Sequence, residues 1–294
     1  MENGAKNKFG FLKTMTGYLA ALAVGYGAAV GGLYFAQRSL IYYPDQTRPL
    51  APDFGVPEMT AFDLTTEDGI NLLTWYHPPA SASAPVIVYF HGNAGHIGYR
   101  ASKIRPYMDA GFGVLLLSWR GYSGNEGSPS EEGLYSDGRA ALSFLETEGI
   151  TPDRMVLYGE SLGSAIAVEL AHNQAESGTS VGAVVLEAPF TSLPEVATQH
   201  YPWLPVSWMM EDRFESLSKI GDVMSPVLVL HGELDNVVPV DQGWRMAEAA
   251  KKPKQGRFYA EAGHNDLYEF DAADSVISFI EKYASGQETE TISP

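Results

Sequence analysis

A glycine-bounded pentapeptide, residues 159–163 (GESLG), constrains the fold of this chain more than any other feature. The short apolar run RMVLY directly before it is typical of a buried strand, and the run SAIAVELAHNQ directly after it is typical of a helix. A strand that turns at once into a helix needs a tight turn, and glycines at both ends of the turn remove side chains that would clash. The sequence therefore predicts a strand–turn–helix unit with Ser161 at the helix N-terminus.

Further short apolar runs extend this unit into a sheet. Each run is almost continuously hydrophobic, as expected for a strand buried on both faces, and longer helix-like stretches separate the runs. The expected strands cover residues 72–76, 86–90, 114–118, 155–158, 183–186, 227–230 and 258–260. This alternation predicts an α/β fold with a mostly parallel sheet covered by helices. Its chemistry is expected beyond the carboxyl ends of the strands.

The N-terminal region predicts a membrane anchor. Residues 14–37 contain no charged side chain and exceed the roughly 20 residues that a membrane-spanning helix needs. Three lysines precede this segment against one acidic residue (Lys6, Lys8, Lys13 and Glu2). The positive-inside tendency then predicts a cytoplasmic tail over residues 1–13 and a catalytic domain on the opposite side of the membrane.

Some features of this region leave alternatives open. Arg38 and Arg48 lie on the far side of the apolar segment and oppose the predicted orientation. A cleaved signal peptide would need small residues before its cleavage site, and the bulky Tyr34 stands two positions before Ala36. A GxxxG spacing at residues 27–31 could let two anchors pack closely, but it arises easily in so glycine-rich a segment. The oligomeric state stays open.

The remaining boundaries follow from composition. Residues 38–58 form a proline-rich linker, in which Tyr42 and Tyr43 stand where an interfacial aromatic belt is expected. A globular domain is predicted over residues 59–284. Prolines and aromatic residues interrupt its alternating pattern at about 189–225, which indicates a compact insertion. The polar residues 285–294 are expected to be a disordered tail.

Charge and cysteine content narrow the function classes. A formal net charge of −17 opposes nucleic-acid binding, because a phosphate-rich partner requires a basic face. The chain has no cysteine, which excludes disulfides, thiolate metal sites and a cysteine nucleophile, and leaves the redox compartment open. His231, Glu233 and Asp235 superficially resemble a metal-ligand cluster, but no further ligand set completes it. Neither a metal nor a cofactor is expected.

Ser161 is the candidate nucleophile, because its strand–turn–helix context is that of a nucleophile elbow. A second GxSxG, residues 178–182, follows a helix and precedes a strand, so we expect it to be a loop. A serine hydroxyl needs a base to take its proton, and that base needs a carboxylate to orient it.

Among seven histidines, His264 is the predicted base, since it follows a late strand in a turn and preserves the order serine, acid, histidine. His172 and His200 are expected to be surface or packing residues. Asp235, a few residues after the strand VLVLHG, is the predicted acid, and Glu187 at the end of the preceding strand is its rival.

Two backbone N–H groups are predicted to stabilise an oxyanion. Leu162, directly after the nucleophile, supplies one of them. The other is expected from the loop HGNAG after strand 86–90, at Asn93, with Ala94 as the close alternative. The glycines of this loop lack the Lys-Ser/Thr of a P-loop and the spacing of a dinucleotide site, so a phosphate cradle is not expected.

Seven motifs together give the chain a wider resemblance: QRSLIYYP, FHGNAGHIG, SWRGYSGNEGSPSEEGL, YGESLGSAIA, EAPFTSL, YPWLPVSW and HGELDNVVP. Through them, residues 59–283 resemble the α/β-hydrolase superfamily, and more narrowly its membrane-anchored abhydrolase-domain and bud-emergence type proteins. The resemblance implies an eight-stranded sheet, the triad Ser161–Asp235–His264, and hydrolysis of an ester or thioester without a cofactor.

Three functions follow as hypotheses. The first is an acyl-ester or thioester hydrolase, which its anchor would place beside lipidic substrates. The second is a membrane scaffold that keeps the fold and uses residues 201–208 as a contact surface, against which the complete triad argues. The third is a peptidase, which would usually need a larger cap or an added domain.

Overall fold

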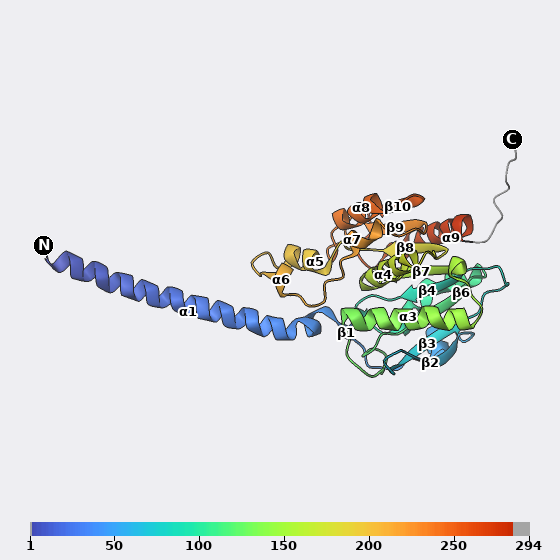
Figure 1. Cartoon of the computed structure of the whole chain (residues 1–294), viewed down its shortest axis with the longest axis horizontal. Helices are drawn as coiled ribbons and strands as arrows, with labels where there is room; N and C mark the ends of the chain where they lie inside the picture. Colours follow the sequence, from blue (N-terminus) through green and yellow to red (C-terminus); the bar gives the residue numbers. More distant parts are fainter. Residues whose placement is uncertain (1, 285–294) are drawn as a thin grey trace.

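A long N-terminal helix projects from an α/β domain in the computed structural model, which describes residues 2–284 (Figure 1). Helix α1 (Glu2–Ile41) begins before the predicted anchor and ends beyond it. Its apolar part, Thr14–Ile41, is long and apolar enough to cross a membrane. The predicted disordered tail, residues 285–294, lies outside the described residues.

Eight strands form the central sheet in the order β10-β9-β8-β7-β4-β6-β3-β2. All neighbours pair in parallel except β3, which is antiparallel to both β2 and β6. The bounds are β2 (Thr60–Thr65), β3 (Asn71–His77), β4 (Val86–Phe90), β6 (Gly113–Leu117), β7 (Met155–Glu160), β8 (Ala183–Glu187), β9 (Val227–Gly232) and β10 (Lys254–Tyr259). The prediction of a mostly parallel, eight-stranded sheet is confirmed.

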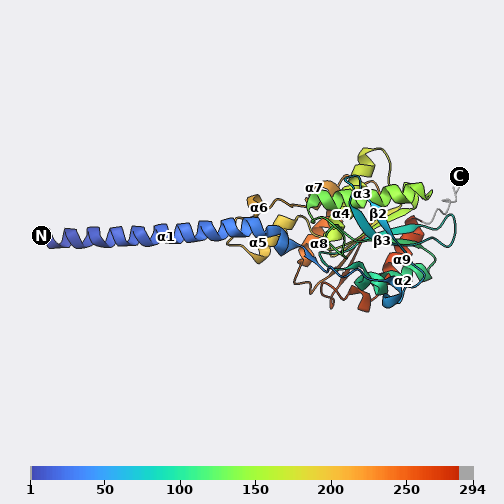
Figure 2. The same ribbon diagram turned by 90° about the horizontal axis from the view of Figure 1, so that it is seen from below.

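Helices cover both faces of this sheet, and the strand side chains alternate between two buried clusters. Val88 and Phe90 of β4 enter one cluster with α3 (Glu131–Thr147), α4 (Leu162–Glu176) and α8 (Val240–Ala249). Ile87 and Tyr89 enter the other with α2 (Ala101–Asp109) and α9 (Ala272–Tyr283). Figure 2 shows α3 on one side of the sheet and α2 and α9 on the other. Burial on both faces explains why the central strands are continuously hydrophobic.

The two edges of the sheet depart from the expected strands. The sequence pattern does not predict β2, whose side chains are exposed or half-buried. The run predicted at 258–260 is the end of β10, which begins at Lys254 with mostly exposed residues. Edge strands of this kind are polar because one side faces water, so their sequences lack the apolar run used to find the others.

The segment after α1 is tied to the sheet. Strand β1 (Tyr43–Pro44) pairs with β5 (Ala94–Gly95), in the loop that follows β4. Tyr42 is buried in the core, and a short 3-10 helix, η1 (Ala51–Phe54), follows. Three further 3-10 helices complete the described chain, namely η2 (Ile97–Arg100), η3 (Pro152–Arg154) and η4 (Leu267–Glu269).

Residues 189–225, called the cap below, connect β8 to β9 and contain short helices. They are α5 (Leu193–His200), α6 (Val206–Met209) and α7 (Ser216–Ile220). In Figure 1, α5 and α6 lie beside the C-terminal part of α1, on the side of the domain from which that helix leaves.

Candidate active site

Ser161 occupies a strained turn between β7 and α4. Its φ of 50° and ψ of −113° are rare for a residue with a side chain. Its N–H donates to the Glu187 carbonyl at 2.8 Å, and its own carbonyl accepts from the Ser164 N–H at 2.9 Å. Backbone strain of this kind persists only where the surroundings over-determine it, and it gathers at functional sites. The predicted strand–turn–helix unit is therefore present, with Ser161 at its apex.

The two glycines of the pentapeptide are required by close packing of backbone. A Cβ atom on Gly163 would lie 1.9 Å from the carbonyl oxygen of Phe90, at the end of β4. A Cβ atom on Gly159 would lie 2.4 Å from the carbonyl oxygen of Gly163. Backbone atoms cannot move aside as a flexible side chain can. The second GxSxG, residues 178–182, lies in the connection between α4 and β8, as a loop.

The three residues predicted to form the triad lie together at the carboxyl ends of the strands. His264 Nε2 lies 3.0 Å from the Ser161 hydroxyl oxygen. His264 Nδ1 lies 2.6 Å from Asp235 Oδ2. Ser161 follows β7, Asp235 follows β9 and His264 follows β10, so three separate strands position the three side chains. A continuous path of hydrogen bonds joins the carboxylate to the hydroxyl.

Asp235 is held as an ionised acceptor. Its Oδ1 accepts from the backbone N–H groups of Val237 and Val238, each at 2.8 Å. Burial alone would raise the pKa of Asp235, but hydrogen bonds from His231 and His264 outweigh it and hold that pKa well below its usual range. An ionised carboxylate can only accept, so His264 Nδ1 carries the proton that it donates. His264 Nε2 is then free to accept the Ser161 proton.

His231 is a further positioning residue that sequence reasoning did not identify. It is fully buried, and its Nε2 lies 2.8 Å from the Val238 carbonyl and 3.2 Å from Asp235 Oδ2. Because a carbonyl only accepts, Nε2 carries the proton, and it faces the same carboxylate oxygen as His264. The signal in the sequence is the spacing of four between His231 and Asp235, which also resembles a metal-ligand pattern. The described residues hold no group of three or more His, Asp or Glu side chains arranged for a metal ion.

Glu187, the rival acid, is engaged elsewhere. Its carboxylate accepts from Lys103 Nζ and from the Tyr158 hydroxyl, both at 2.6 Å. Glu160, the second residue of the pentapeptide, joins the same buried network through Arg100 at 3.0 Å. Burial would raise the pKa of Glu160, but Lys103 and Arg100 together hold it well below its usual range. Glu187 is therefore held by other partners, and Asp235 is the carboxylate that contacts His264.

The residues predicted to supply the oxyanion donors line the same cavity as Ser161. Leu162 is the first residue of α4, where backbone N–H groups have no partner within the helix. The Asn93 carbonyl accepts from the Tyr43 N–H at 2.9 Å, and its side-chain amide donates to the Ile41 carbonyl at 2.9 Å. The Asn93 N–H takes no part in these contacts, and Asn93, Ser161 and Leu162 line the same cavity. Ala94, the alternative donor, lies in β5.

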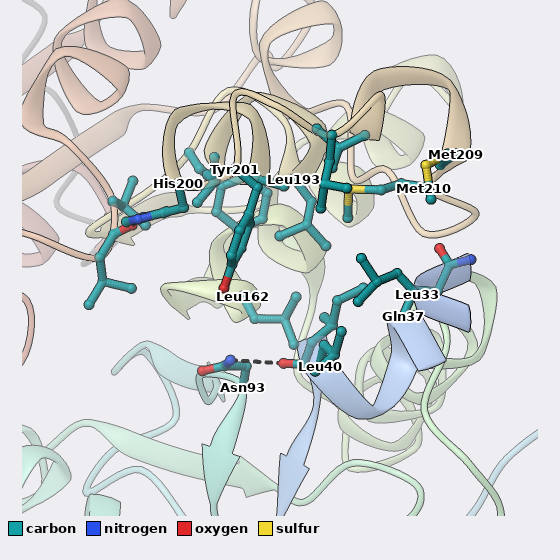
Figure 3. A pocket seen from close by; sticks show the side chains of 18 of the residues that line it. Leu33, Gln37, Leu40, Asn93, Leu162, Leu193, His200, Tyr201, Met209 and Met210 are labelled. Atoms are coloured by element: carbon teal, nitrogen blue, oxygen red, sulfur yellow. Dashed lines mark hydrogen bonds between the residues drawn. The ribbon is translucent and has the colours of Figure 1, made fainter. Parts of the chain in front are cut away.

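That cavity has a volume of about 400 Å³ and an almost wholly apolar wall (Figure 3). The C-terminal part of α1 supplies one side and the cap supplies the other, and Ser161 also lines the cavity. The lining residues are Leu33, Tyr34, Gln37, Leu40, Ile41, Tyr43, Asn93, Ser161, Leu162, Phe190, Leu193, Val196, Ala197, His200, Tyr201, Trp203, Leu204, Val206, Met209, Met210, Val237 and Val238. None of these is an Asp, Glu, Lys or Arg. Sequence reasoning placed α1 in the membrane but did not place it in this wall.

Other histidines have structural contacts. His91, in the loop that bears Asn93, is fully buried, and desolvation, with Arg100 nearby, lowers its pKa to about 3. His200 Nε2 lies 2.8 Å from the Val237 carbonyl at the edge of the cavity. His172 lies half-buried on α4 beside Glu176, which agrees with the expectation of a surface or packing residue.

The sequence of this chain is similar to a protein family and to several known proteins. The family described as "Serine aminopeptidase, S33" matches residues 81–219. An uncharacterised protein of Mycobacterium tuberculosis is 38% identical over 250 residues, which are 84% of this chain and 87% of the relative. The bem46 protein of Schizosaccharomyces pombe is 32% identical over 76% of this chain and 78% of its own length. The lysophosphatidylserine lipase ABHD12 of Danio rerio is 32% identical over 72% of this chain and 64% of its own length.

Solved structures share the fold. An α/β hydrolase of Vibrio vulnificus superposes with a TM-score of 0.67 at 25% identity, covering 80% of this chain and 89% of its own. The esterase Pf2001 of Pyrococcus furiosus superposes with a TM-score of 0.63 at 17% identity, covering 83% of this chain and 98% of its own. The second likeness concerns the architecture alone.

Proposed function

This chain belongs to the α/β-hydrolase superfamily, and from that premise we propose that it is a membrane-anchored serine hydrolase that cleaves carboxylic ester or thioester bonds of acyl compounds. One observation carries the proposal, namely the hydrogen-bonded path from Asp235 through His264 to Ser161. It ends on a strained serine that opens into an apolar cavity. Fold alone would not justify it, since this fold hosts many chemistries.

In the first half-reaction, the Ser161 oxygen attacks the acyl carbonyl carbon while His264 Nε2 takes the hydroxyl proton. The negative charge that forms on the carbonyl oxygen is stabilised by the N–H groups of Leu162 and Asn93. Asp235 stabilises the imidazolium. His264 then gives the proton to the leaving alcohol or thiol as its bond to the acyl carbon breaks, and an acyl-Ser161 ester remains.

In the second half-reaction, water replaces the alcohol. His264 takes a proton from the water, whose oxygen attacks the acyl carbon, and the same two N–H groups hold the oxyanion. The Ser161 oxygen leaves with the proton from His264. The acid product and the free enzyme result, with no cofactor in the balance.

The cavity wall favours an acyl substrate over a peptide. A peptidase that selects chain ends needs a charged group to receive the terminal amine or carboxylate, and the described cavity wall has none. The description of the matching family, a serine aminopeptidase, keeps peptide cleavage as the alternative. The name of the zebrafish relative, a lysophosphatidylserine lipase, supports an acyl lipid as the substrate class here.

The apolar helix is proposed to be a retained signal-anchor, with residues 1–13 cytoplasmic and the domain on the opposite side. Two contacts support retention, because cleavage at Ala36 would remove them. The Tyr26 hydroxyl donates to the Trp203 carbonyl of the cap, and the Tyr34 hydroxyl donates to Glu211. The linker (38–58) and domain (59–284) boundaries proposed from composition are kept, with the first residues of that linker belonging to α1.

A chain-length series of p-nitrophenyl acyl esters tests the proposal on the full chain in detergent. Turnover that disappears in the Ser161→Ala variant is expected for esters, with little or none for matched p-nitroanilide amides. Equal background rates in both proteins would favour the scaffold alternative. Faster turnover of aminoacyl anilides than of esters would favour the peptidase.

A further inference from the structure

The geometry points to a second role for α1, which rests on the hydrolase function proposed above. We propose that α1 is one wall of the acyl-binding site, and that the acyl chain of a membrane lipid enters the cavity sideways from the bilayer, between α1 and the cap. The anchor would then select the substrate as well as hold the enzyme on the membrane.

One face of α1 lines the cavity. Leu33, Gln37, Leu40 and Ile41 recur at helical spacing, so their side chains point to the same side of the helix. Figure 3 shows Leu33, Gln37 and Leu40 across the cavity from the cap residues, with Leu162 between them. The cavity is therefore not closed by the catalytic domain alone, and its apolar surface continues onto the helix that enters the membrane.

Hydrogen bonds fix the cap against this helix. The Tyr34 hydroxyl donates to Glu211 Oε1 at 2.7 Å, and Gln37 Oε1 accepts from the Glu211 N–H at 2.8 Å. Arg38 donates to both carboxylate oxygens of Asp212, at 3.1 and 3.2 Å. These contacts place the two walls of the cavity in a defined position relative to each other.

Asp212 joins three parts of the chain at this point. Its side chain is only 3% exposed and also accepts from the Tyr42 hydroxyl at 2.9 Å and from the Glu131 N–H at 3.0 Å. The buried Asp212 carboxylate of the cap therefore accepts hydrogen bonds from α1, from Tyr42 directly after α1, and from the start of α3. A buried charge with its acceptor positions filled is costly to disturb, so the walls are expected to stay together.

The contacts of α1 also set the depth of the cap. A helix rises about 1.5 Å per residue, so in a bilayer core of about 30 Å that begins at Thr14, Leu33 lies near the far boundary. Tyr26 lies deeper, yet its hydroxyl donates to the Trp203 carbonyl at 3.0 Å. The tip of the cap therefore lies within the membrane. The side chains of Trp203 and Trp208 are 62% and 78% exposed, and in that position their large apolar rings can be buried among acyl chains.

The depth and the apolar wall of the cavity indicate the class of ligand that it binds. The part of the cavity between α1 and the cap lies at the depth where acyl chains of the far leaflet begin, and its wall has no charged side chain. A long acyl chain can slide in along Leu33 and Leu40 without crossing water, while its ester carbonyl reaches Ser161. A short, water-soluble ester needs only the catalytic end of the same cavity.

Bulky substitutions on α1 test the proposed wall. The full chain is reconstituted in phosphatidylcholine vesicles and given p-nitrophenyl palmitate in the bilayer or p-nitrophenyl acetate in solution. In Leu33→Trp and Leu40→Trp, the ratio of palmitate to acetate turnover is expected to fall on the order of 10-fold, because extra bulk fills the acyl path. The control Leu22→Trp makes the same change on the same helix, at a residue that is 70% exposed and outside the cavity wall. An unchanged ratio in both wall variants would overturn the proposal.

A photocrosslinking measurement separates this inference from the catalytic one, because it needs no turnover. Palmitic acid with a terminal diazirine is added to vesicles containing the Ser161→Ala variant. Labels are expected on the cap residues Leu193 and Met210, which face α1 across the cavity, and they should disappear when Leu40→Trp is added. Labelling confined to the lipid-exposed face of α1 would overturn the lateral path. If the cap is labelled but the wild type does not hydrolyse p-nitrophenyl acetate, the acyl site stands and the hydrolase function fails.

Discussion

The two sides of the candidate active site are built in different ways. At the carboxyl ends of the strands, Ser161, Asp235 and His264 are placed by a rigid sheet and by turns with little freedom. At the cavity, α1 and the cap are placed by side-chain contacts between segments about 170 residues apart, such as Arg38 with Asp212. The three side chains are therefore positioned by the backbone of a paired sheet, whereas the shape of the cavity depends on side-chain contacts between α1 and the cap.

This difference predicts separable effects of mutation. A change at the strand ends should abolish turnover of every substrate, because all substrates use the same nucleophile and base. A change between α1 and the cap should alter which substrates are turned over. The predictions below test this separation, beginning with the largest expected effect.

Removing the base should give the largest loss. In His264→Ala, kcat for short and long esters is expected to fall roughly 10,000-fold, because no group remains to take the Ser161 proton. Asp235→Asn should cost about as much, since an amide cannot stabilise the imidazolium. Steady-state kinetics with p-nitrophenyl esters measures both. The control His172→Ala removes a half-buried histidine of α4 that lies outside the cavity wall, and a comparable loss there would contradict the assignment.

A single methyl group in the turn should have the next largest effect. Gly163→Ala places a Cβ atom 1.9 Å from the Phe90 carbonyl oxygen, so the free energy of unfolding is expected to fall by at least about 3 kcal/mol. Urea unfolding followed by circular dichroism measures the change. Gly221→Ala is the matched control, because its added Cβ atom meets nothing closer than 3.7 Å. Equal stabilities of the two variants would show that the turn can relax.

Loss of the Asp212 carboxylate between α1 and the cap should have a moderate effect that depends on the substrate. Asp212→Ala leaves the Tyr42 hydroxyl and the Glu131 N–H without their acceptor, so a loss of about 2 kcal/mol in unfolding free energy is expected. Arg38 contributes little to that figure, because it is half-exposed.

Turnover of long esters should fall more than turnover of short ones in the same variant, since the walls of the cavity separate. The exposed Asp222 provides the control variant, Asp222→Ala. An equal loss of turnover for short and long esters would show that the triad and the cavity do not have separable effects, and would contradict the comparison.

The pH dependence of stability should give the smallest effect. The folded-state pKa of Asp235 lies below its usual value of 3.8, so the ionised carboxylate stabilises the fold above that pH. This contribution is lost as the pH falls below about 4 towards the folded-state pKa. The difference in unfolding free energy between wild type and Asp235→Asn should therefore narrow on acidification. If the difference widens on acidification, the folded-state pKa of Asp235 is raised and not lowered, which would contradict the account.

The strand-end region was largely predictable from the sequence, because its signals are local. Glycines at 159 and 163 are demanded by contacts within one turn, and the buried strands are continuous apolar runs. The order of Ser161, Asp235 and His264 then left few candidates for each position. The structure brings these three side chains together, and their catalytic roles stay predictions.

The remaining features could not be predicted because no local pattern records them. His231 was recognisable as a histidine near Asp235, but the carboxylate oxygen that it shares with His264 depends on three-dimensional placement. The edge strand β2 lacks an apolar run. The contact of α1 with the cap joins residues far apart in the chain, and an apolar helix has the same composition whether lipid or protein covers it.

The most direct test of the catalytic assignment is covalent labelling of the full chain with a fluorophosphonate, which reacts with activated serine hydroxyls. Mass spectrometry of the digested protein is expected to find the adduct on Ser161, with labelling at least about 1,000-fold slower in His264→Ala because the hydroxyl is no longer activated. An adduct on another serine, or equal rates in the two proteins, would contradict the assignment of Ser161 as a nucleophile activated by His264.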